Sequence, residues 1–191
     1  MQVPGLLQEY KGCLATRKFD EAEKINKEIN YFITNEINTT GEELRYFADD
    51  LLNKARRFEE SIPVYFAAAS LFKKEGDLME MRRCVGGGWW TGMDGVNEGM
   101  IARDVTMKEV GKRHVIPLMH DIKNQMLEMT SVSEKDKCWC MSRVLGSIAR
   151  SEELVNDDVA AKEAWEEKRV WKEKWWELPS TFPLESEWSL E

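Results

Sequence analysis

The chain has 191 residues, of which 42% are hydrophobic and 32% charged, and its formal net charge at pH 7 is −8. This length allows one domain with a sizeable core, and the acidic balance argues against a nucleic-acid partner that requires a basic surface. No apolar run approaches 18 residues, and residues 1–5 lack the basic and apolar regions of a signal peptide, so neither a membrane-inserted nor a secreted protein is expected.

Helix signals follow one another along the chain. Three segments open with Asp or Thr and carry Glu three residues later, the spacing of a capping box, and each continues with apolar residues at helical intervals. The pairs are Asp20 with Glu23, Thr40 with Glu43, and Asp77 with Glu80. No segment shows the alternation typical of a strand, so the sequence predicts an all-α fold.

Two prolines indicate where further helices begin. Proline is tolerated in the first turn of a helix, so Pro63 predicts a helix that begins near residue 60 or 61, and Pro117 predicts one over 117–129. Ser133 opens another over 133–150, and a last helix spans about 152–177. Together the signals predict nine helices.

The helices repeat with a period near 40 residues. An aromatic or apolar residue followed by a small residue three positions later occurs at Phe19, Phe58 and Val96, which are 39 and 38 residues apart. Helix pairs with such a period are typical of a helical solenoid.

The segment from Leu44 to Cys84 resembles a tetratricopeptide repeat. The resemblance lies in Ala55-Arg-Arg-Phe58-Glu-Glu-Ser61 and in the stretch from Ala67 to Asp77, which is similar to the long-period repeats of soluble NSF attachment proteins. It is good over this one repeat and weaker on either side, and Asp49 stands where the repeat usually has a small residue. The resemblance implies a tetratricopeptide-like (TPR-like) solenoid of three to four helix pairs over residues 1–150.

The resemblance also implies a role in binding a partner protein or peptide segment along the first helices of the pairs. This predicts a non-catalytic adaptor or assembly subunit. The basic and Asn residues that clamp a C-terminal carboxylate in chaperone-binding repeats are absent from the corresponding positions, so no such peptide is expected. The predicted partner-binding residues on these helices, with two neighbouring indoles, are Tyr46, Asp50, Asn53, Lys54, Met81, Cys84, Gly88, Thr91, Trp89 and Trp90.

The run Gly86-Gly87-Gly88-Trp89-Trp90 leaves an alternative open. It has neither the preceding strand nor the Gly-Lys-Ser/Thr ending of a phosphate loop, and close helix packing against an indole is the simpler interpretation. The alternative function is a small helical enzyme or ligand-binding protein with a pocket at residues 86–95.

No catalytic centre, metal site or cofactor is predicted. His114 and His120 lie six residues apart, and Cys138 and Cys140 two apart, so neither pair shares one face of a helix. The four cysteines are too few and too scattered for a disulfide framework, which favours free thiols and a cytoplasmic location.

The C-terminal part is rich in tryptophan. Residues 151–178 are expected to form a capping helix that closes the solenoid, with Ala161, Ala164 and Trp165 against the helix that carries Val144 and Ile148. Its indoles could instead form a partner surface that includes Trp171 and Trp188, or a face for homo-oligomer formation. Residues 179–191 are expected to form an ordered tail.

Overall fold

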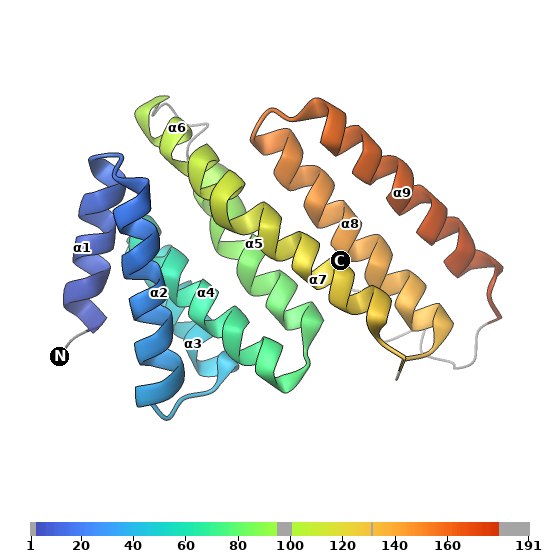
Figure 1. Ribbon diagram of the computed structural model, residues 1–191, viewed down its shortest axis with the longest axis horizontal. Coiled ribbons are helices and arrows are strands. Elements are labelled where there is room, and N and C mark those ends of the chain that lie inside the picture. The colour runs from blue at the N-terminus through green and yellow to red at the C-terminus, as the bar shows by residue number, and fades with distance from the viewer. Residues whose placement is uncertain (1–2, 95–100, 131, 180–191) are drawn as a thin grey trace.

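The computed structural model describes residues 3–94, 101–130 and 132–179. This part of the chain is helical and contains no strand, which confirms the all-α prediction (Figure 1). The elements are α1 (Val3–Ala15), α2 (Phe19–Glu36), α3 (Gly41–Asp49), the π-helical segment η1 (Asp50–Lys54), α4 (Phe58–Glu75), α5 (Leu78–Asp94), α6 (Ile101–Val110), the π-helical segment η2 (Gly111–Val115), α7 (Ile116–Glu128), α8 (Glu134–Leu154) and α9 (Asp158–Glu177).

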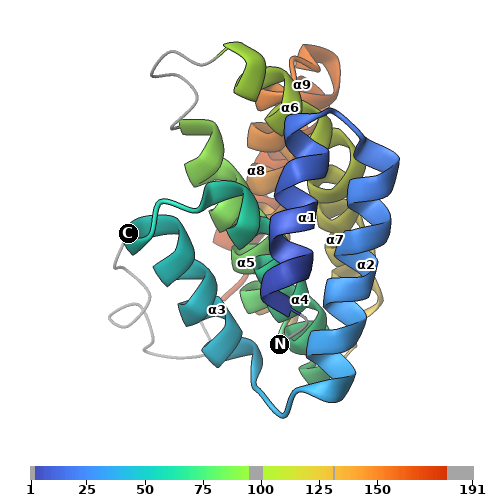
Figure 2. The same ribbon diagram turned by 90° about the vertical axis from the view of Figure 1, so that its left-hand side faces the viewer.

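Helices that follow one another in the chain pack against one another. α1 lies on α2, α3 on α4, α4 on α5, and α8 on α9, and α1 and α2 both contact α4. α5 joins the two ends of the molecule, because it contacts α3 and α4 on one side and α7 and α8 on the other (Figures 1 and 2). One hydrophobic core runs through all of these contacts.

Local capping signals place several helix starts correctly. The Thr40 hydroxyl accepts a hydrogen bond from the Glu43 N–H at 3.2 Å, and the Glu43 carboxylate accepts one from the Thr40 N–H at 2.9 Å. Asp77 caps α5 by accepting from the Glu80 N–H. The predicted box at Asp20 is wrong, because α2 begins at Phe19, directly after a tight turn from α1.

The predicted start of α4 near residue 60 is also wrong. α4 begins at Phe58, so Pro63 lies in its second turn, where proline costs about 3 kcal/mol in a helix interior. The first turn is held against α1 by Glu60, which is only 1% exposed, accepts a hydrogen bond from Gln8 at 3.1 Å and pairs with Arg57. This buried tertiary contact overrides the proline preference.

α7 spans Ile116–Glu128 with Pro117 in its first turn, as predicted, but it is not a separate helix. Val110 and Ile116 keep right-handed helical angles, so α6, η2 and α7 form one continuous helix. The N–H of Ile116 bonds to the carbonyl of Gly111, five residues back. This widened turn directly before Pro117 makes room for its ring. α7, the second half of this long helix, packs against α8, and α8 in turn packs against α9.

The turn between α8 and α9 lies later than predicted. α8 extends to Leu154, and Asn156 then adopts φ 64°, a left-handed conformation that Asn tolerates and that ends a helix. Asp157 begins α9 by accepting a hydrogen bond from the Ala160 N–H at 3.1 Å.

The C-terminal helix packs on α8 through small residues. Ala161 and Ala164 are buried, as predicted. Trp165 is 38% exposed, which corrects its predicted place in this contact. Its Nε1 donates to Glu153 at 2.7 Å, and the Lys168 Nζ lies 4.3 Å from its ring centroid. The predicted ordered tail, apart from Pro179, and Trp188 lie outside the described residues.

The indole of Trp89 joins α5 to the long helix α6–η2–α7. It is almost fully buried, and its Nε1 donates to the carbonyl of Met107 at 2.8 Å. A Cβ on Gly111 would overlap the Trp89 ring, so only glycine fits opposite the indole. Gly86 similarly faces the ring of Trp90, where a Cβ would lie 2.7 Å from the ring atom Cη2. Because Trp90 belongs to the same helix, Gly86 packs against an indole as predicted, but not against a neighbouring helix.

We expect Gly111→Ala to destabilise the protein. The added methyl group would force apart α5 and the long helix, and overpacking of this kind costs about 1–3 kcal/mol. The matched control is Gly12→Ala in α1, where an added Cβ meets nothing within 4 Å. The control should stabilise the protein by up to about 1 kcal/mol through helix propensity. Thermal unfolding measures both, and equal melting temperatures for the two variants would contradict the predicted role of Gly111.

Candidate functional site

A cavity of about 280 Å³ lies between α3 with η1 and α5. We call it the α3–α5 groove. It combines apolar side chains with an unusual number of guanidinium groups. Its lining residues are Arg45, Asp49, Leu52, Asn53, Tyr65, Arg82, Arg83, Gly87 and Trp90.

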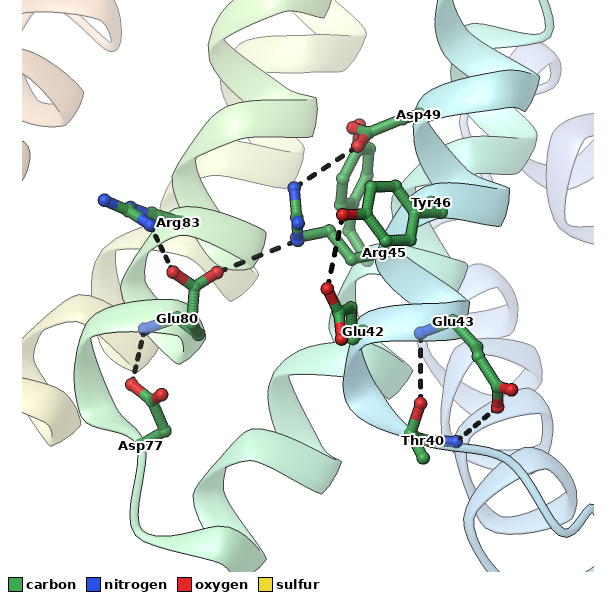
Figure 3. Close-up of polar contacts among 10 residues, drawn as sticks. Thr40, Glu42, Glu43, Arg45, Tyr46, Asp49, Asp77, Glu80 and Arg83 are labelled. Carbon is green, nitrogen blue, oxygen red and sulfur yellow. Dashed lines mark hydrogen bonds and ion pairs between the residues drawn. The ribbon is translucent and has the colours of Figure 1, made fainter.

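An ion-pair network bridges the two helices at the edge of this groove. Figure 3 shows the Arg45 guanidinium between Asp49 on its own helix and Glu80 on α5, with N–O distances of 3.5 and 3.7 Å. Glu80 also pairs with Arg83. The network therefore fixes α3 relative to α5 and uses both carboxylates to neutralise Arg45 and Arg83.

Asp49 has a second partner on α4. The hydroxyl of Tyr65 donates a hydrogen bond to its carboxylate. Burial, reinforced by this bond, raises the pKa of Tyr65 above its ordinary value, so the hydroxyl stays protonated and acts as a donor. This contact accounts for an acidic residue at a position where the resembling repeat has a small one.

Arg82 is the exceptional residue of the groove. It is 9% exposed, and its Nη1 donates to the Ser147 hydroxyl of α8 at 2.8 Å, while its Nε has no hydrogen-bond partner. Among the described residues, no carboxylate lies within ion-pair distance of it. Burial first, and then the positive charges of Arg143 and Arg83, lower the pKa of Arg82 to about 10. The guanidinium is thus still charged at pH 7.

The predicted partner-binding residues of α3 and η1 lie in or beside the groove. Asn53 lines it. Tyr46 is 55% exposed, and its hydroxyl donates to Glu42 at 3.2 Å (Figure 3). Asp50 and Lys54 are exposed and pair with one another at 2.7 Å.

The predicted residues of α5 divide into two groups. Trp90 lines the groove. Met81, Cys84 and Trp89 are buried in the core, which corrects their assignment to a partner surface, because their face of α5 is covered by neighbouring helices. Gly88 belongs to α5, and the side chain of Thr91 lies outside the described part.

The C-terminal predictions are separate from the groove. Trp171 is half-buried on α9, and the Lys174 Nζ lies 5.3 Å from its ring centroid. Trp188 lies outside the described residues. Trp176 is 67% exposed, although the sequence analysis did not select it.

The sequence analysis missed the three arginines of the groove. Arg45 directly precedes Tyr46, and Arg82 and Arg83 stand between Met81 and Cys84. A usable signal was present, because Arg82 lies four residues after Leu78 and three before Val85, both of which are buried. A charged residue on an otherwise apolar helix face indicates that its charge will be buried with that face.

Two kinds of reactive group, metal-ligand clusters and activated thiols, can be assessed among the described residues. No group of three or more His, Cys, Asp or Glu among them could hold a metal ion. The four cysteines are free, and burial raises the pKa of Cys84 to about 12 and that of Cys140 to about 11, so these thiols are not activated nucleophiles.

Comparisons with protein-family models, with curated proteins and with solved structures found no match to this chain. Within the described residues, no helix combines the length and the apolar character needed to cross a membrane. The chemistry of the groove is therefore the main guide to function.

We expect Arg82→Met to raise the stability of the protein. The variant removes a buried charge that lacks a carboxylate partner while keeping a long side chain. In the variant the Ser147 hydroxyl still donates a hydrogen bond to the carbonyl of Arg143, at 3.1 Å. A gain of about 1 kcal/mol corresponds to a rise in melting temperature of about 2–4 °C. The control is Arg83→Met, at a side chain that is 58% exposed, which should change the melting temperature less. A lower melting temperature for Arg82→Met would show that its charge is structural.

Proposed function

We propose that this protein is a non-catalytic adaptor or assembly subunit that binds a segment of a partner protein in the α3–α5 groove. In this proposal the successive helix pairs are TPR-like repeats, and α3 with η1 and α5 are the first helices of two neighbouring pairs. The observation that carries the proposal is the charged Arg82, buried beside the groove without a carboxylate partner among the described residues.

The lining of the groove suits a peptide segment. Leu52 and Trp90 supply apolar contact, and Asn53 supplies an amide that can donate and accept hydrogen bonds. Tyr46, exposed on the same helix as Arg45, extends this surface along α3. Tyrosine, tryptophan and arginine are the residue types enriched at interaction hot spots.

The state of the cysteines supports a binding role. Their thiols are free, and burial raises the pKa of each of them. Free thiols suit a reducing compartment, which is why we propose the cytoplasm as the location.

The alternative is a small-molecule site at residues 86–95. One observation favours it, because Gly87 and Trp90 line the cavity together with converging charged groups. The two proposals differ in what they require, since a peptide segment must extend beyond the cavity along α3, whereas a small ligand is confined to it.

We expect Gly87→Leu to block partner binding without disturbing the fold. A Cβ at Gly87 meets nothing within 4 Å, so the larger side chain would enter the groove. Peptides selected on the wild-type protein from a displayed random library should bind Gly87→Leu at least about 10-fold more weakly, since a blocked pocket loses a central contact. Calorimetric titration measures the affinities.

The matched control is Gly12→Leu, at a second unobstructed helical glycine on α1, which should bind the peptides like the wild type. Peptides that bind Gly87→Leu as tightly as the control would place the binding surface elsewhere. Failure to recover any peptide, together with stabilisation of the wild type but not Gly87→Leu by a small metabolite, would favour the alternative.

A further inference from the structure

The charges around the groove do not balance. Three guanidinium groups, those of Arg45, Arg82 and Arg83, face the two carboxylates of Asp49 and Glu80. Both carboxylates are engaged by Arg45, Glu80 also by Arg83, and Asp49 also by Tyr65. Among the lining residues one guanidinium has no carboxylate of its own, and it belongs to the most buried arginine of the three. The positive charge of Arg143 on α8 adds to this excess.

The excess positive charge is held at one fixed place, the guanidinium of Arg82. Its Nη1 is held by the Ser147 hydroxyl, a neutral partner that orients the guanidinium without neutralising it. A buried charge is costly unless it is paired, and no carboxylate among the described residues forms an ion pair with Arg82, although Glu80 favours its charged form from farther away. A negatively charged ligand group would supply the missing partner.

A carboxylate matches this requirement better than a phosphate does. A phosphate carries up to two negative charges and would bring more negative charge near the Asp49 and Glu80 carboxylates than a carboxylate does. Guanidinium and carboxylate groups also form two parallel hydrogen bonds when their planes align. The apolar wall at Leu52 and Trp90 can cover the methylene groups that precede a carboxylate in a side chain.

We propose that the groove recognises an acidic side chain, Asp or Glu, in the partner segment, and that Arg82 is the residue that pairs with it. This inference deepens the proposed function and rests on it. Arg45 pairs with Asp49 and Glu80, and Arg83 pairs with Glu80, so both carboxylates of the groove are already engaged by other guanidinium groups.

The test uses the full chain and a random peptide library displayed through the peptides' C-terminal ends, so that no free terminal carboxylate is present. Clones that bind the wild type and fail to bind Gly87→Leu are groove ligands. Among them we expect one Asp or Glu position to be enriched. A synthetic groove ligand with both ends blocked is then compared with its Glu→Gln or Asp→Asn counterpart by calorimetry.

On the wild type, loss of the peptide carboxylate should weaken binding about 10-fold or more, as expected for a hydrogen bond between charged groups. On Arg82→Met the two peptides should bind equally well. Arg169→Met is the control, at a side chain on α9 that is 73% exposed and does not line the groove, and it should keep the preference for the acidic peptide. Arg82→Lys should keep part of it, since the charge remains and the forked geometry is lost.

The outcomes separate the two proposals. Groove ligands without an enriched acidic position, or an acidic preference that survives in Arg82→Met, would overturn the role of Arg82 and leave the adaptor proposal standing. The acidic peptide is also challenged with sodium phosphate and, separately, with sodium chloride at the same ionic strength. Displacement by phosphate but not by chloride would identify a site for small anions and overturn the acidic-segment assignment. Recovery of no groove ligand would instead contradict the adaptor proposal itself.

Discussion

The packing of the Trp89 indole against Gly111 is the constraint on which the rest of the structure depends. The indole fills the space between α5 and the long helix α6–η2–α7, and it can do so only because residue 111 has no side chain. Residues on one helix keep fixed angular positions, so burying Trp89 also determines the direction of its neighbours. Arg82, seven residues earlier, falls on nearly the same buried face, while Trp90 is turned toward the α3–α5 groove.

The packing of α5 therefore creates the chemical character of the groove. α5 is surrounded by α3, α4, α7 and α8 and therefore has little exposed surface. Because Arg82 lies on a covered face of α5, its charged side chain is buried. Its contact with Ser147 ties the charge to α8. A protein that needed only stability would favour an apolar side chain here, because a buried unpaired charge opposes folding. Such local conflicts with stability are expected at functional sites.

Features that depend on contacts between residues close in the sequence were predicted correctly, whereas features that depend on contacts between distant residues were not. The capping box at Thr40 was predictable because both of its hydrogen bonds lie within four residues. The position of Pro63 and the continuity of the helix across Pro117 were not, because contacts with α1 in one case and a widened π-helical turn in the other override the local preference. The all-α class and most helix bounds therefore followed from the sequence. The groove did not, because Asp49 and Arg82 line one cavity only when α3 packs beside α5, although the charged residue on the apolar face of α5 was visible in the helical pattern.

The overall charge of the chain limits which acidic segments the groove can accept. At −8 the protein repels a highly acidic partner during approach, although at physiological salt this repulsion is screened beyond about 8 Å. On the exposed side of α3, the carboxylate of Glu42, which accepts a hydrogen bond from Tyr46, would oppose further negative charge, whereas Asp50 is paired with Lys54. The single surplus charge at Arg82 acts only at short range. A segment with one acidic residue between neutral or basic neighbours satisfies both conditions, so the proposal predicts a preference for an isolated carboxylate over an acidic tract.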